Sequence, residues 1–146
     1  MTHRATIDVR FNEIDPYGHV NHSVYVTYFE VGRTYALEAC GIPLELMAER
    51  GYQMVVTHID VRFKRAAAAG EQLIVETEIA EMRRASGTWR QRILRSRGGT
   101  DGVADDEEVL VTAEVTAGIT DRTGRPTKPP DWLFPALETL RADERR

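Results

Sequence analysis

The sequence has little that would support a disulfide framework or a membrane span. Its one cysteine, Cys40, cannot close an intramolecular disulfide, and it falls among the apolar residues of a predicted helix, so we interpret it as a packing residue. No run of about 18 consecutive apolar residues occurs, and the N-terminal residues lack the apolar stretch of a signal peptide. We therefore expect a cytoplasmic protein with no membrane partner.

An excess of positive charge is also missing. The 146 residues carry a formal net charge of −4, which gives no electrostatic reason to expect nucleic acid as a partner. Hydrophobic residues make up 42% of the chain and charged residues 29%, as is usual for globular proteins. No repeat, low-complexity tract or linker divides the chain, so we expect a single domain over residues 1–146.

Alternation of apolar and polar residues predicts five strands. The first runs from Thr6 to Phe11, where Ile7, Val9 and Phe11 alternate with polar residues. The other four follow in series at Met54–Lys64, Leu73–Met82, Thr88–Arg97 and Val109–Ile119. Ser86-Gly87 marks a tight hairpin connection, and residues 98–108 form a longer, polar, glycine-rich loop. We expect these four strands to form an antiparallel meander.

Helical periodicity appears mainly between Ser23 and Ala39, a segment without proline. Asn21 or Ser23 can cap its start, and Gly41 followed by Pro43 supplies a stop. Shorter helices are expected at Pro43–Arg50 and Trp132–Leu140. The element order predicts an α+β fold, with one helix across an antiparallel sheet. Such a sheet leaves an edge strand unpaired, so we expect the protein to form oligomers.

The residues that could take part in a reaction lie just before and at the start of the long helix. This segment reads Phe11-Asn12-Glu13-Ile14-Asp15-Pro16-Tyr17-Gly18-His19-Val20-Asn21-His22-Ser23-Val24-Tyr25. A carboxylate held there can attack an electrophilic carbonyl or activate a water molecule, and Asp15 is the candidate. The free N–H groups at a helix N-terminus can stabilise the developing oxyanion. Here these donors would come from around His22 and Ser23.

This segment resembles the signature of the hotdog-fold thioesterases of the 4-hydroxybenzoyl-CoA thioesterase type, Asp-x-x-Gly-x-Val followed by an aromatic residue or His and then a long helix. Tyr28-Phe29-Glu30 with Arg33, the run Val61–Arg65 and the segment Asp121–Pro126 also resemble that family. The resemblance implies a hotdog fold, an antiparallel β-sheet wrapped around one long buried helix. It also implies hydrolysis of an acyl-CoA substrate to free acid and coenzyme A, without a cofactor, by a homodimer or homotetramer.

The same resemblance assigns the catalytic carboxylate to Asp15 and the carbonyl-polarising backbone amide to His22. Gly18 would let the backbone turn closely around the thioester, and His19, Tyr17 and Tyr25 are expected to contact the substrate. Charge-assisted contacts to the phosphates of coenzyme A are expected from two basic groups. One is Arg62, Lys64 and Arg65, to which we assign the contacts, and the other is Arg83, Arg84, Arg90 and Arg92. His19 and His22 stand without a cysteine cluster, so no metal site is expected.

Several alternatives stay open. Asp15-Pro16 is a common turn dipeptide, and Glu13 is a second nearby acid. Glu30 and Arg33 are i, i+3 neighbours on the helix, and we expect them to pair with each other. Hotdog proteins also hydrate or dehydrate enoyl thioesters with an Asp and a His a few residues later, and Asp15 with His19 superficially fits that pattern. After the thioesterase and the hydratase or dehydratase, a non-catalytic acyl-CoA-binding module is the third hypothesis.

Overall fold

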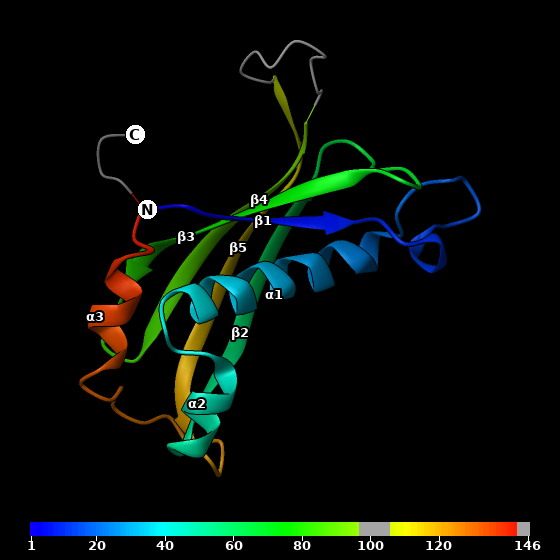
Figure 1. Cartoon of the computed structure of the whole chain (residues 1–146). Helices are drawn as coiled ribbons and strands as arrows, with labels where there is room; N and C mark the ends of the chain where they lie inside the picture. The colour runs from blue at the N-terminus through cyan, green and yellow to red at the C-terminus, as the bar shows by residue number, and fades with distance from the viewer. Residues whose placement is uncertain (97–105, 143–146) are drawn as a thin grey trace.

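The fold is one antiparallel sheet with helices on one face, in a computed structural model that describes residues 1–96 and 106–142 (Figure 1). The strands are β1 (His3–Asp8), β2 (Tyr52–Phe63), β3 (Gln72–Met82), β4 (Ser86–Ser96) and β5 (Glu107–Asp121). The α-helices are α1 (His22–Ala39), α2 (Leu44–Glu49) and α3 (Leu133–Glu138), and a single 3-10 turn, η1 (Phe11–Glu13), follows β1. The predicted element types and their order are confirmed.

The strand order is β1-β3-β4-β5-β2, with every neighbouring pair antiparallel. Strands β3, β4 and β5 form the expected meander, but the prediction that β2 continues it was wrong. β2 pairs with β5 at the far edge of the sheet. The eight residues 64–71 that join β2 to β3 can reach across three strand spacings, about 14 Å. A connection of that length does not force a hairpin.

Local boundaries differ by a few residues from the prediction at the start of the chain. β1 ends at Asp8 rather than continuing to Phe11, which lies in η1 and is 91% exposed. The reason is that the Arg10 N–H donates to Glu13 Oε1 at 2.8 Å and the Glu13 N–H to the Arg10 carbonyl, so the chain turns away from the sheet.

The connections between the last strands were predicted less closely. Ser86 and Gly87 begin β4, and the turn before it is formed by residues 83–85. The predicted glycine-rich loop at 98–108 lies mostly outside the described residues, because the description resumes at 106 and β5 begins at Glu107.

Helix α1 lies across one face of the sheet, as predicted, and contacts β3, β1 and β4 (Figure 1). Its buried residues are Tyr25, Tyr28, Phe29, Gly32, Ala36 and Leu37. Gly32 permits close approach, since a Cβ there would lie 2.6 Å from Val75 Cγ1. The side chain of the buried Gln91 of β4 stabilises this contact by donating a hydrogen bond to the carbonyl oxygen of Phe29 at 2.9 Å. This packing fixes the N-terminus of α1 relative to the sheet.

The edge strand β2 is the most exposed part of the sheet. Val55, Val56, Ile59 and Phe63 are all large apolar residues left exposed on it. Across the described ranges 1–96 and 106–142, none of the helices combines the length and apolar character needed to cross a bilayer.

Candidate functional site

The loop around Asp15 is closed at its base by an antiparallel bridge between Ile14 and Val20. Within it, the Gly18 N–H donates to the carbonyl oxygen of Asp15 at 3.1 Å. Gly18 adopts φ +82°, in the left-handed region that favours glycine. The expected tight turn at Gly18 is therefore present, and it projects residues 15–19 from the start of α1.

The Asp15 carboxylate is oriented by two backbone donors. Its Oδ1 atom accepts from the N–H of Tyr17 at 2.8 Å and from the N–H of His19 at 3.1 Å. The side chain is half-buried, and within residues 1–96 and 106–142 its Oδ2 atom has no hydrogen-bond partner. One oxygen is thus fixed while the other is available to a substrate or a water molecule.

The N-terminus of α1 offers one unused donor beside this loop. Asn21 is the N-cap, and its Oδ1 atom accepts from both the N–H and the hydroxyl of Ser23 at 3.1 Å. The Ser23 amide, which was expected to be available, is therefore occupied. In the part of the chain that the structure describes, nothing accepts from the His22 N–H. That N–H, at the positive end of the helix dipole, can bind an oxyanion.

The exposed ring of Phe63, which the sequence did not single out, lies beside His22. The ring of Phe63, at the end of β2, lies 6.4 Å from the His22 ring in edge contact and 5.7 Å from the Tyr25 ring. Phe63 is 52% exposed although it faces the α1 side of the sheet, because it lies on the edge strand. An exposed ring at this place can contact an apolar acyl group. Alternation within β2 was the signal that could have indicated it.

The remaining residues predicted in the loop differ in their surroundings. Tyr17 and His19 are exposed, whereas Tyr25 is buried and its hydroxyl accepts from the Ala67 N–H at 2.9 Å. Burial raises the pKa of Tyr25 above its ordinary value. The hydroxyl of Tyr25 is therefore occupied, and its ring contacts the exposed ring of Phe63. Asp15, Tyr17, Gly18 and His19 are thus joined in one hydrogen-bonded loop, and His22 and Tyr25 both contact Phe63.

The predicted phosphate-binding residues are less uniform. Arg65 pairs with Glu108 at 3.0 Å, and Arg62 lies 3.8 Å from Asp60. Lys64 forms no ion pair with any residue in 1–96 or 106–142. Since β2 side chains alternate, Arg62 lies on the face opposite to Phe63. The structure therefore does not bring Arg62 to the Asp15 loop.

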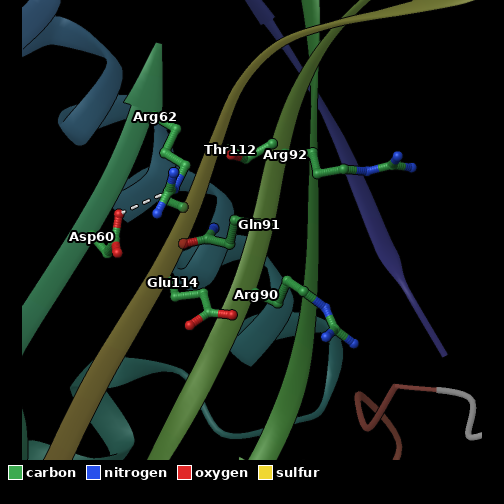
Figure 2. Close-up of a pocket in the computed structure, with 8 residues that line it drawn as sticks. Asp60, Arg62, Arg90, Gln91, Arg92, Thr112 and Glu114 are labelled. Carbon is green, nitrogen blue, oxygen red and sulfur yellow. Dashed lines mark ion pairs between the residues drawn. The ribbon is translucent and has the colours of Figure 1, made fainter. Parts of the chain in front are cut away.

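Arg62 instead lines a shallow hollow of about 300 Å³ on the outer face of the sheet, away from α1 (Figure 2). The charged residues around it are Asp60, Arg62, Arg90, Arg92 and Glu114. Arg90 pairs with Glu78 at 3.0 Å and Arg92 pairs with Glu76, and Figure 2 shows both arginines directed away from β2. Because these cations already have carboxylate partners, the hollow carries little net attraction for an anion.

Glu30 and Arg33 do not pair as expected. The Arg33 guanidinium donates instead to Gln91 Oε1 at 2.9 Å. Its pKa is lowered, chiefly by burial. Tertiary contact with the sheet therefore overrides the i, i+3 pairing on the helix surface.

Comparison with known proteins identifies the family of the chain. A sequence model of the thioesterase-like superfamily matches residues 9–137. Acyl-CoA thioester hydrolase YbgC of Escherichia coli is 32% identical over 109 residues, which cover 74% of this chain and 78% of that protein. Acyl-acyl carrier protein thioesterase ATL3 of Arabidopsis thaliana is 31% identical over 91 residues, 62% of this chain. The match spans only 45% of the length of ATL3 and 65% of that of its relative ATL2.

Solved structures show the same architecture. A hypothetical protein of Thermus thermophilus, TT1821, superposes with a TM-score of 0.83 at 29% identity, covering 98% of this chain and 100% of that chain. A variant of 4-hydroxybenzoyl-CoA thioesterase complexed with 4-hydroxybenzoyl-CoA gives 0.81 at 21% identity, covering 93% and 98%. The α+β hotdog fold expected from the sequence is confirmed.

Proposed function

The chain belongs to the thioesterase-like superfamily, and from this premise we propose that it hydrolyses an acyl-CoA thioester to the free acid and coenzyme A. The observation that carries the proposal is that a carboxylate and an unused backbone N–H occur together around the start of α1. Asp15 has one oxygen fixed by two N–H groups and one oxygen free, in the loop that leads into α1, and His22 at the start of α1 has an unused N–H. A nucleophile or base beside an oxyanion donor is what acyl transfer requires.

In the proposed reaction the His22 N–H donates a hydrogen bond to the thioester carbonyl oxygen and stabilises the negative charge that forms on it. Asp15 then acts by one of two routes. As a nucleophile it forms an anhydride and expels the coenzyme A thiolate, and water afterwards hydrolyses the anhydride. As a general base it takes a proton from a water molecule that attacks the carbonyl. The His22 imidazole takes no part in either route.

The proposal includes a second copy of the chain. The exposed apolar residues of β2 lie along an unpaired sheet edge, and an edge of this kind is a template for pairing with another strand. Val26 of α1 is a further exposed apolar residue. We infer that β2 forms a subunit interface in a homodimer or homotetramer, and that Phe63 lies where this interface meets the Asp15 loop.

For the coenzyme A portion, Lys64 is the strongest candidate to contact a phosphate, because it directly follows the end of β2 and has no competing ion pair in residues 1–96 and 106–142. Arg65 can contribute only by leaving Glu108. Arg62 lies on the other face of the sheet and contributes less to this proposal. Tyr17 and His19, both exposed on the loop, would flank the pantetheine arm.

The test is a thiol-release assay across acyl-CoA chain lengths, aryl-CoA esters and the matching acyl-carrier-protein thioesters. Release of thiol from coenzyme A esters supports the proposal, and faster release from carrier-protein esters would move the substrate to that carrier. Consumption of an enoyl-CoA double bond without thiol release would identify a hydratase. Saturable binding by calorimetry without either reaction would leave only a binding module.

A further inference from the structure

Two buried tyrosines on neighbouring turns of α1 support the Asp15 loop from below. Tyr25 and Tyr28 are each 3% exposed, and their rings meet edge to face at 6.2 Å. Their hydroxyl groups bond to two different segments of the chain. Tyr25 accepts from the Ala67 N–H at 2.9 Å, and Tyr28 donates to Glu13 Oε1 at 2.7 Å.

These two segments hold the two sides of the loop. The carbonyl oxygen of Ala67 accepts from the Val20 N–H at 2.9 Å. The carbonyl oxygen of Glu13 accepts from the Asn21 N–H, also at 2.9 Å. Each tyrosine hydroxyl therefore bonds to a residue whose carbonyl oxygen accepts one of the hydrogen bonds that close the base of the Asp15 loop.

Glu13 connects Tyr28 to the segment that precedes the Asp15 loop. Its Oε1 atom accepts from Tyr28 and also from the Arg10 N–H at 2.8 Å. Burial and then the bond to Glu13 raise the pKa of Tyr28 far above its ordinary value, so the hydroxyl remains a donor at any pH at which the protein is assayed. A buried hydroxyl bonded to a carboxylate is a strong, directional contact.

We propose that Tyr28 and Glu13 are positioning residues that fix the Asp15 carboxylate relative to the His22 N–H. Neither residue bonds to the Asp15 side chain, whose Oδ1 donors are Tyr17 and His19. They act through the backbone at Asn21, which leads directly into the helix N-terminus. The inference rests on the proposed hydrolase for its kinetic consequence, but not for its structural one.

Three variants separate positioning from catalysis. Tyr28→Phe keeps the ring and removes the donor, and we expect kcat to fall about tenfold with KM unchanged, because reacting groups then lose alignment. Glu13→Gln keeps an oxygen that accepts from both donors, so kcat should stay within about threefold, whereas Glu13→Ala should fall at least as far as Tyr28→Phe. If Glu13 were the general base, Glu13→Gln would lose roughly 10²- to 10⁴-fold, which would overturn the assignment.

Amide hydrogen exchange gives a readout that does not depend on activity. In Tyr28→Phe the amides of Tyr17, His19 and Asn21 should exchange about tenfold faster, since local opening costs less. The amides of β4 should not change. Tyr35→Phe is the matched control, because Tyr35 is on the same helix, 46% exposed and without a hydrogen bond in residues 1–96 and 106–142.

The outcomes are distinguishable. Unchanged exchange in Tyr28→Phe overturns the positioning role whatever the kinetics show. A wild-type protein that releases no thiol from any thioester overturns the proposed function, and faster exchange in the variant then still supports the structural role. Equal exchange changes in Tyr28→Phe and Tyr35→Phe would mean that the effect is general loosening of α1, which also overturns the proposal.

Discussion

Asp15 and His19 are joined by two hydrogen bonds, both of which use backbone groups of His19. The N–H of Asp15 donates to the carbonyl oxygen of His19 at 2.7 Å, and the N–H of His19 donates to Asp15 Oδ1 at 3.1 Å. The histidine orients the carboxylate without its imidazole, which is not hydrogen-bonded to any residue in 1–96 or 106–142. A hydratase pair would use both side chains, so this arrangement supports hydrolysis over hydration.

Replacing Asp15 by Asn should abolish hydrolysis and leave the fold intact. The amide oxygen can still accept from Tyr17 and His19, but the side chain is neither a nucleophile nor a base. We expect kcat to fall by at least roughly 10²- to 10⁴-fold, about 3 to 5 kcal/mol of barrier. Steady-state kinetics with circular dichroism measures both. More than about a tenth of wild-type kcat would make Asp15 a turn residue and direct the search to Glu13 or Glu30.

The exposed edge of β2 should make the protein at least a dimer. Light scattering after size exclusion should give a multiple of the 16.5 kDa chain mass. Ile59→Lys should shift the protein toward monomer and lower its activity, because an unpaired ammonium group at a buried interface is costly. Tyr35→Lys, an exposed position on α1 beside β1, is the control and should not dissociate it. A monomeric wild type with full activity would contradict the shared interface.

Local signals in the sequence predicted most of the fold. The helix α1 was predicted within one residue because its cap, its periodicity and its stop at Gly41 are all encoded in neighbouring residues. The place of β2 was not, since strand order depends on pairing between distant segments and the 64–71 connection allows more than one partner. The same limit explains why Arg33 was assigned to Glu30 rather than to Gln91.

The site was predictable only in its loop. The turn at Asp15 and the helix start at His22 follow from Gly18 and Asn21, which act over a few residues. The contacts of Phe63 with His22 and the hydrogen bond between Tyr28 and Glu13 are tertiary contacts between different elements, and no local spacing encodes the partners. Alternation indicates which face Phe63 is on, but not that an edge strand leaves that face open.

Gly32 is a packing requirement that a stability measurement can test. In Gly32→Ala the new Cβ would meet Val75 Cγ1 at 2.6 Å and Thr77 Oγ1 at 3.0 Å, both buried. We expect a loss of about 1 to 3 kcal/mol of unfolding free energy from overpacking, read as a lower Tm. Gly118→Ala is the control, because its Cβ would make an ordinary contact of 3.6 Å. An unchanged Tm in Gly32→Ala would mean that α1 can move away from the sheet without cost.

Lys64→Ala should weaken binding of acyl-CoA without slowing chemistry. A phosphate contact remote from the thioester stabilises ground state and transition state equally, so KM rises and kcat does not fall. We expect KM to rise about three- to tenfold, roughly 0.7 to 1.4 kcal/mol. Thioesters that lack the nucleotide should show no change. Arg62→Ala gives the comparison at an arginine on the outer face of the sheet, and an equal effect there would refute the assignment to Lys64.

Phe63→Ala tests whether the exposed ring beside His22 contacts the acyl group. The ring is held by His22 and Tyr25 but leaves half its surface open, and aromatic contacts contribute about 0.5 to 1.5 kcal/mol beyond the area they bury. We therefore expect kcat/KM to fall about three- to tenfold, with Phe63→Leu intermediate. Phe11→Ala, 91% exposed and without a ring contact in residues 1–96 and 106–142, should change nothing. The oligomeric mass is measured in parallel, because Phe63 ends the edge strand. A fall in kcat/KM with the mass unchanged assigns the ring to the substrate, whereas wild-type kinetics with every thioester would remove Phe63 from the site.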